Sequence, residues 1–327
     1  MTVRAFFRAA KVESATPPYD TIHLKVLYPA RMSGSEQKRN LGMVPADAEL
    51  APFPVVIFFG GVNCSPEMYQ WLAVGLAQRG LVVVTFAWVA ENWPGAIALT
   101  PGVDLAMVKP DTYGKGPTAT ALPALLAELE KLQSQGILAG MLDLQKIILG
   151  GHSAGGRTAL ESADPRFYPQ VTSAFAYGAH SAAATMLGFE PNIILPLPSS
   201  LPLLLMGGTC DGVIAASCWR YGISTSNPTK SIVRTFNEAI TGGRNDTYLV
   251  IFEGANHFCV VYPPDPTIGS SFLDLPATQP EDQIRSLMLE TVGLFINAHV
   301  RAKPELSHAL AHLLGDSNAL VASFERK

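Results

Sequence analysis

The sequence predicts an α/β fold in which a mostly parallel central sheet carries helices on both faces. Continuous apolar runs are typical of strands buried on both faces, and they occupy 54–59, 81–86, 172–177, 203–206 and 247–252. Segments of helical composition or spacing alternate with these runs, at 66–79, 117–135 and 280–299. Glycine-rich turns follow several runs, so the chain is organised as strand–turn–helix units with right-handed crossovers.

Three further segments complete the predicted secondary structure. Residues 20–30 alternate apolar and polar side chains, which is typical of a half-buried antiparallel strand at a sheet edge. We expect a helix near 231–240 and a further helical segment through 304–324. The run at 247–252 would then be the last strand of the core.

Length and composition favour a single domain over the whole chain, 1–327. Of its 327 residues, 48% are hydrophobic, which is enough for a full-size core. A net charge of −4 argues against a nucleic-acid partner, since nucleic-acid-binding domains concentrate basic residues. No apolar run is long enough to cross a bilayer, and residues 1–14 lack a sustained apolar stretch, so we expect neither a membrane span nor a secretory signal.

The cysteine pattern points to unpaired thiols. The chain has four cysteines without the spacing of a zinc site: Cys64, Cys210, Cys218 and Cys259. We therefore expect free thiols in a reducing compartment, and hence a cytoplasmic protein, with a disulfide as the alternative.

Two long segments break the alternation of strands and helices. Residues 87–116 and 180–202 contain large apolar side chains without a clean strand or helix period. Long irregular loops are often functional, and these would lie over the carboxyl ends of the strands, where open α/β sheets bind ligands. The alternative is a pair of surface excursions packed on themselves. As a substrate-binding wall we expect Trp88, Trp93, Met186 and Phe189.

The most informative stretch is a G-x-S-x-G motif, Gly151-His152-Ser153-Ala154-Gly155, between an apolar run and a helical segment. That context predicts a nucleophile elbow, a strained turn that lifts the serine hydroxyl clear of the sheet. Glycine suits both ends of the motif, because a Cβ there would collide with the neighbouring strand or helix. By itself, the motif is also consistent with a glycine-rich turn that contains a serine by chance.

Two polar residues follow later strands in the order that a serine nucleophile requires. Asp211 comes after the run at 203–206, and His257 comes after the run at 247–252. Parallel strands would bring both to the sheet edge that carries Ser153, although 58 and 46 residues separate the three in sequence (211 − 153 and 257 − 211). Singly, Asp211 could be a turn residue and His257 a loop histidine. Jointly, they predict a catalytic triad.

Other polar residues fit the triad less well. Asp143 and Asp164 are rival acids, but neither follows a strand in the required order. His152 is adjacent to the serine, and a neighbouring side chain points elsewhere, so we expect a structural role for it.

The predicted chemistry is acyl transfer through a covalent intermediate. His257 would take the proton of the Ser153 hydroxyl and later pass it to the leaving alcohol. Asp211 would hold the imidazole in the correct tautomer and stabilise the imidazolium. This chemistry requires no cofactor and no metal.

The tetrahedral oxyanion also needs backbone N–H donors. One would come from Ala154, the residue after the nucleophile. The other would come from Gly61 or Val62, in the loop after the strand at 54–59.

These residues resemble the α/β-hydrolase superfamily over about 20–300, and within it the chlorophyllase branch, near the dienelactone-hydrolase-like and platelet-activating-factor acetylhydrolase-like esterases. The matching stretches are PVVIFFGG (54–61), GLVVVTFAW (80–88), GGHSAGGRTAL (150–160) and GANHF (254–258). The chain departs from the chlorophyllase pattern at Ala154, where an arginine is usual, and at Gly60, where a histidine is usual. The resemblance implies an α/β-hydrolase fold and cofactor-free hydrolysis of a carboxylic ester, with the phytyl ester of chlorophyll as one candidate.

Three functions stay open on the sequence. The first is a chlorophyllase-like serine carboxylesterase that acts on a small-molecule ester with a large apolar group, and the second is a general carboxylesterase, lipase or polyester hydrolase. The third is an apolar-ligand binder without catalysis, although a binder has no need of all three triad groups. Contact with a membrane surface and the oligomeric state are also left open.

Overall fold

A single large sheet forms the centre of the protein. The computed structural model describes residues 1–327 except 33–34, 37–39, 41, 43, 94 and 316. In the described part, nine strands pair in the order β1-β2-β4-β3-β7-β8-β9-β10-β11. Their bounds are β1 Thr2–Lys11, β2 Thr21–Ala30, β3 Phe53–Phe59, β4 Val82–Ala87, β7 Leu142–His152, β8 Val171–Tyr177, β9 Leu203–Gly208, β10 Thr247–Phe252 and β11 Val321–Arg326.

The sheet is mostly parallel. β2 runs antiparallel to β1 and β4, and β11 runs antiparallel to β10. The six strands between them, β4, β3, β7, β8, β9 and β10, run parallel to one another. The predicted α/β class with a mostly parallel sheet is therefore confirmed.

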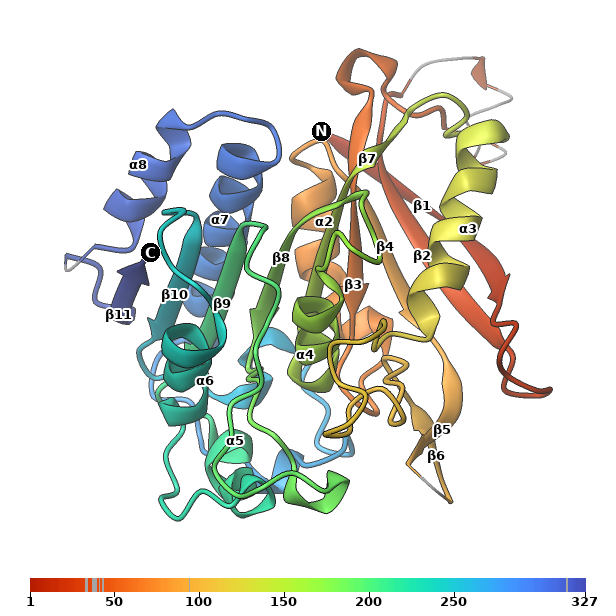
Figure 1. The fold of residues 1–327 in the computed structure, drawn as a ribbon. Helices are drawn as coiled ribbons and strands as arrows, with labels where there is room; N and C mark the ends of the chain where they lie inside the picture. The colour runs from red at the N-terminus through yellow and green to blue at the C-terminus, as the bar shows by residue number, and fades with distance from the viewer. Residues whose placement is uncertain (33–34, 37–39, 41, 43, 94, 316) are drawn as a thin grey trace.

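Helices cover both faces of this sheet (Figure 1). One core lies between the sheet and α3 (Ala121–Ser134), α4 (Ser153–Ser162) and α6 (Lys230–Arg234). A second core lies on the opposite face, against α2 (Gln70–Ala77), α7 (Glu281–His299) and α8 (Glu305–Leu313).

Burial on both faces explains the apolar runs. In β3, Val55, Ile57 and Phe59 belong to one core, while Val56 and Phe58 belong to the other. Successive side chains of a strand point to opposite faces, so both sets must be apolar.

The two outermost strands correct the expected sheet edges. The strand predicted at the edge, 20–30, is the inner strand β2, because β1 pairs with it along its whole length. At the other end, the segment predicted as helix through 304–324 contains α8 only to Leu313. It then forms β11, which makes β10 an inner strand rather than the last one.

The segments outside the sheet also differ from expectation in part. The irregular segment 87–116 begins with a two-stranded hairpin, β5 (Val89–Trp93) and β6 (Ala96–Leu99). The helix expected near 231–240 is α6 followed by a π-helical turn, Thr235–Ala239.

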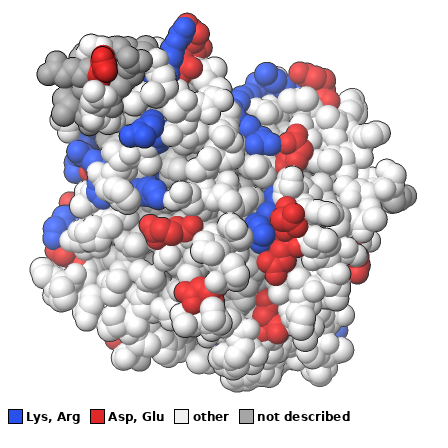
Figure 2. Space-filling model, turned by 180° about the vertical axis from the view of Figure 1, so that it is seen from behind, with Lys and Arg blue, Asp and Glu red and all other residues white. Residues whose placement is uncertain are grey.

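The described part of the chain shows how charged side chains are distributed on the surface and in what state the cysteines are. Acidic and basic side chains are interspersed on the face seen in Figure 2. None of the described helices combines the length and apolarity that crossing a bilayer requires. All four cysteines lie in the described part, and all are free thiols.

Candidate active site

Ser153 lies at a sharp turn between β7 and α4. β7 ends at His152 and α4 begins at Ser153, whose φ of 54° places it in the left-handed region that residues other than glycine rarely adopt. A Cβ on Gly155 would lie 2.3 Å from the carbonyl oxygens of Phe59 and Gly60. The expected crowding at the motif is therefore confirmed, and it explains why the turn can hold the serine in a strained conformation.

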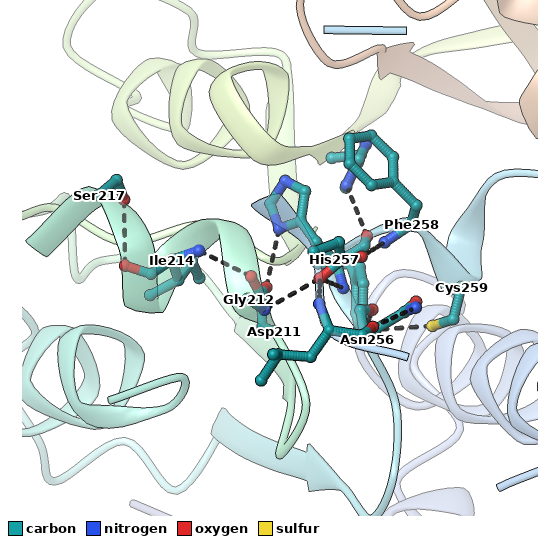
Figure 3. A network of polar contacts seen from close by, with 12 residues as sticks. Asp211, Gly212, Ile214, Ser217, Asn256, His257, Phe258 and Cys259 are labelled. Carbon is teal, nitrogen blue, oxygen red and sulfur yellow. Dashed lines mark hydrogen bonds and ion pairs between the residues drawn. The ribbon is translucent and has the colours of Figure 1, made fainter. Parts of the chain in front are cut away.

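Asp211 and His257 form a buried hydrogen-bonded pair (Figure 3). Nδ1 of His257 donates to Oδ2 of Asp211 at 2.8 Å, and both side chains are almost fully buried. The other carboxylate oxygen of Asp211 accepts from the backbone N–H of Ile214 at 2.8 Å and caps α5 (Gly212–Ser217). Asp211 is thus both a turn residue and the partner of the histidine, and Nε2 of His257 is left to exchange a proton.

The environment of His257 raises its pKa above the ordinary value. Burial by itself lowers the pKa, because it disfavours the charged imidazolium. The charge and hydrogen bond of Asp211, with a smaller contribution from Asp274, outweigh burial. The histidine is therefore a stronger base than a free imidazole.

Gly178, just after β8, covers this pair. Its φ is 61°, and a Cβ there would lie 3.0 Å from Nδ1 of His257 and 3.3 Å from Oδ2 of Asp211. Only glycine fits this backbone conformation at such a close approach.

Ser153 and His257 line one cavity of about 350 Å³. Ala154, Gly61 and Val62 border the same cavity, while Asp211 is hydrogen-bonded to His257 and does not border it. Among the hydrogen bonds of the described residues, none joins Ser153 to His257. The structure thus brings the three predicted triad residues to one sheet edge, with the acid–base pair formed and the serine facing the same space.

The sequence left the oxyanion donor of the loop after β3 open between Gly61 and Val62, and these two N–H groups differ in the structure. The backbone N–H of Gly61 donates to the hydroxyl of Tyr69 at 3.0 Å inside the protein, so it is already used. No acceptor for the N–H of Val62 is found within the described part of the chain. Ala154 lies in the first turn of α4, where N–H groups have no acceptor within the helix. The N–H groups of Val62 and Ala154 are therefore available to an oxyanion. Of the two loop candidates, this favours Val62 over Gly61.

His152 connects the loop of Gly61 to the loop of His257. Its Nε2 lies 3.0 Å from the backbone oxygen of His257, and because a carbonyl only accepts, Nε2 carries the proton. The neutral ring then accepts at Nδ1 from the hydroxyl of Tyr69, at 2.9 Å. Burial lowers the pKa of His152 well below its usual value and keeps it neutral. The chain of bonds from Gly61 through Tyr69 and His152 to His257 agrees with the structural role expected for His152.

Asp274 is a part of this site that the sequence does not reveal. Its carboxylate accepts from the backbone N–H groups of Gly212 at 2.9 Å, His257 at 3.1 Å and Phe258 at 3.0 Å. It therefore fastens the loop that carries Asp211 to the loop that carries His257. Asp274 follows no strand and belongs to no motif, so no local signal distinguishes it from other loop acids.

The rival acids are engaged elsewhere. Asp143 lies in the first part of β7, far along the strand from the turn, and pairs with Lys146. Asp164 pairs with Arg166, which lowers the pKa of that carboxyl despite partial burial. Neither borders the cavity.

The predicted apolar wall does not line the cavity. Trp88 is buried in the core, and its indole N–H donates to the backbone oxygen of Tyr19 at 2.8 Å. Trp93 lies on the β5–β6 hairpin with about a third of its surface exposed, at 36%, and Met186 is largely exposed in a short 3-10 helix. None of these residues, nor Phe189, is among those that border the cavity. The two long segments contribute polar residues instead, Asn92 and His180.

Nowhere in the described part of the chain do three His, Cys, Asp or Glu side chains come together in a way that could hold a metal ion. The arrangement offers a nucleophile position, a buried acid–base pair and two backbone donors.

No family model matches the chain. No curated protein matches it either.

Proposed function

We propose that the protein is a serine hydrolase that cleaves carboxylic esters through an acyl-enzyme. The observation that carries the proposal is the buried Asp211–His257 pair beside the cavity that the strained Ser153 also lines. Such a pair can act as a general base, because the carboxylate makes Nε2 of the histidine basic enough to take the proton of a hydroxyl group.

The topology supports an α/β-hydrolase fold as the finer assignment. Each candidate triad residue follows a parallel strand: Ser153 follows β7, Asp211 follows β9 and His257 follows β10. The antiparallel β2 and the turn directly into α4 agree with the resemblance found in the sequence.

In the first half of the reaction, the Ser153 oxygen attacks the ester carbonyl and its proton passes to Nε2 of His257. Asp211 holds Nδ1–H and stabilises the imidazolium. Hydrogen bonds between nucleophile and base are often long in an empty site and tighten when substrate binds. The imidazolium then protonates the leaving alcohol, and the acyl group stays on Ser153.

In the second half, water takes the place of the alcohol. His257 accepts a proton from the water, whose oxygen attacks the acyl-enzyme, and the proton returns to Ser153 as the acid leaves. In both halves the carbonyl oxygen becomes negative, and the N–H groups of Val62 and Ala154 would donate to it. Losing one such donor typically costs roughly 3–4 kcal/mol of transition-state stabilisation.

The alcohol and acyl groups of the substrate are a separate question. The resemblance names the phytyl ester of chlorophyll, but the large apolar side chains expected to bind it do not border the cavity. The broader proposal of a carboxylesterase does not depend on that wall. Turnover of chlorophyll against turnover of p-nitrophenyl butyrate separates the two.

The test of the proposed function is turnover of p-nitrophenyl butyrate by the wild type and by Ser153→Ala. We expect the variant to lose on the order of 10³-fold or more in kcat. Its thermal unfolding should stay close to that of the wild type, which separates lost chemistry from lost folding. Unchanged turnover in a folded Ser153→Ala protein would show that another group performs the reaction.

A further inference from the structure

The side chains with a permanent charge that border the candidate active-site cavity are basic. Among the described residues that border it, two are arginines, Arg157 and Arg220, and none is an aspartate or glutamate. The same wall contains a buried histidine, His180, whose proton position follows from its contacts. These three residues lie outside the triad, and the mechanism above does not use them.

Arg157 is held rigidly on the helix that begins at the nucleophile. It lies four residues after Ser153, and side chains four apart occupy the same face of a helix. Its Nε donates to Glu161 at 2.8 Å, and its Nη1 donates to the backbone oxygen of Ala182 at 2.8 Å. A guanidinium has five N–H groups, so three are left, and none of them has an acceptor among the described residues. The arginine is thus oriented by its neighbours with donors to spare.

His180 is a fixed hydrogen-bond donor beside Arg157. The backbone N–H of Ala182 donates to its Nδ1 at 3.2 Å, so in the neutral ring the proton is on Nε2. Burial, together with the charges of Arg157 and His257, lowers the pKa of His180 to about 3 and keeps the ring neutral. The ring packs edge-on against Tyr221, with the ring centroids 4.7 Å apart.

The position of His180 relates it directly to Arg157. The same residue, Ala182, holds Arg157 through its carbonyl and His180 through its N–H. His180 is more than nine-tenths buried, and its Nε2–H has no acceptor in the described part of the chain, although Nε2 itself is not among the fully buried polar atoms. Because His180 borders the cavity, a ligand or water there can accept a hydrogen bond from this Nε2–H.

Arg220 brings a second charge from a different segment. It lies in the short turn that follows α5, Cys218–Tyr221, and it is exposed. Its guanidinium lies 5.6 Å from the ring centroid of Trp219, and none of the ion pairs among the described residues includes it. The cavity thus has one partly buried and one exposed arginine.

We propose that Arg157, His180 and Arg220 form a subsite for an anionic oxyacid group, so that the substrate is an ester that also carries a carboxylate or a phosphate. This proposal rests on the proposed ester hydrolysis at Ser153. Arginine forks match the paired oxygens of carboxylate and phosphate, and a neutral histidine donor adds a third contact without a charge of its own. A volume of about 350 Å³ also suits a small ester better than a pigment with a phytyl chain.

The test compares esters that differ in one charged group. Ethyl hexanoate is compared with monoethyl glutarate, which carries a carboxylate on the acyl side. Pentyl acetate is compared with 4-acetoxybutyrate and with 3-acetoxypropyl phosphate, which carry a carboxylate or a phosphate on the alcohol side. Acid release is followed at constant pH and low ionic strength. We expect kcat/KM of at least one anionic ester to exceed that of its neutral counterpart by about tenfold, the factor that a charge-assisted hydrogen bond supplies.

Two variants probe the subsite, and both keep a positive charge at position 157, where it balances the charge of Glu161. Arg220→Gln should lower the ratio of anionic to neutral turnover about tenfold. Arg157→Lys keeps a positive charge next to Glu161 but loses the planar fork, so the ratio should also fall. The matched control is Lys230→Gln, which removes the same charge from an exposed site away from the cavity and should leave the ratio unchanged.

The outcomes separate the subsite from the catalytic proposal. If Ser153 is not the nucleophile, Ser153→Ala keeps the wild-type activity on both neutral and anionic esters. If only the subsite is wrong, Ser153→Ala is inactive, and one of two results is seen with the arginines. Either the wild type prefers neutral esters, or its preference for anionic esters persists in both Arg220→Gln and Arg157→Lys. If no ester is turned over, calorimetric titration with glutarate and with inorganic phosphate decides. Binding that Arg220→Gln weakens about tenfold supports the subsite, and absent or unchanged binding overturns it.

Discussion

The carboxylate of Asp274 accepts a hydrogen bond from the backbone N–H of His257, at 3.1 Å, and the same oxygen accepts from Gly212, the residue after Asp211. A single side chain from a distant loop therefore sets how the acid and the base of the candidate triad face each other. Asp274 does not touch the cavity that Ser153 lines, so it acts through His257 and Asp211 as a positioning residue.

Asp274→Asn should lower kcat by up to about 10²-fold with little change in KM, because a small misplacement of the base is costly while substrate contacts are retained. The charge of Asp274 also raises the pKa of His257, so the rise of kcat/KM with pH should move to lower pH in the variant. Asp265→Asn is the control, since the carboxylate of Asp265, in the same segment, accepts hydrogen bonds only from Thr267 and does not border the cavity. A purely structural role for Asp274 would lower kcat through loss of folded protein and leave the pH midpoint in place.

The wild-type pH profile follows from the raised pKa of His257. The base must be neutral to accept the serine proton, so kcat/KM should rise with pH as His257 loses its proton. Because the folded-state pKa lies above 6.5, the midpoint should lie above 6.5. Asp211→Asn should move this midpoint down and cut kcat on the order of 10⁴-fold, because the amide disfavours the catalytic tautomer. A midpoint below 6.5, or one that Asp211→Asn leaves in place, would show that another group titrates.

Tyr69→Phe tests the chain of bonds between the two loops. The change leaves the buried N–H of Gly61 and Nδ1 of His152 without partners, so it should destabilise the protein by roughly 1–3 kcal/mol, measured by urea unfolding. Tyr168→Phe is the matched control, because the buried hydroxyl of Tyr168 has no partner to lose. Equal effects of the two changes would contradict the network.

Gly155→Ala tests the packing of the turn that holds Ser153. The new Cβ would meet two backbone oxygens of the neighbouring strand end at 2.3 Å, so backbone must move, and we expect a loss of roughly 1–3 kcal/mol or more. Gly242→Ala should cost far less, because its Cβ would make only ordinary contacts with the side chain of Lys327. If both variants unfold at the same urea concentration as the wild type, the turn is not constrained in this way.

The inner strands and the candidate triad could be predicted from sequence because each leaves a local signature. Strands such as β3 are buried on both faces, and that requires an unbroken apolar run. Ser153 follows its strand directly, and Asp211 and His257 follow theirs within a few residues, so the predicted topology alone placed them at one edge.

The outer strands and the supporting residues lack such signatures. β1 and β11 are only partly buried, and their patterns are correspondingly weak: Phe7 in β1 is 69% exposed. The roles of Asp274 and Tyr69 arise from contacts with residues 62 and 83 positions away, which no local pattern encodes.

The substrate wall was the least predictable feature. Large apolar side chains in an irregular segment can face a cavity, the core or the solvent, and composition does not distinguish these cases. Trp88 packs in the core and Met186 faces outward, while the cavity is bordered by arginines and a buried histidine.

Covalent labelling of the wild type with a fluorophosphonate, followed by mass spectrometry of the peptides, tests the central proposal most directly. Such reagents react with a serine only when a neighbouring base activates it. We predict one adduct, on the peptide that contains Ser153, with no adduct in Ser153→Ala and much slower labelling in His257→Ala. An adduct on a different serine, or labelling that persists in Ser153→Ala, would contradict the assignment of Ser153 as the nucleophile.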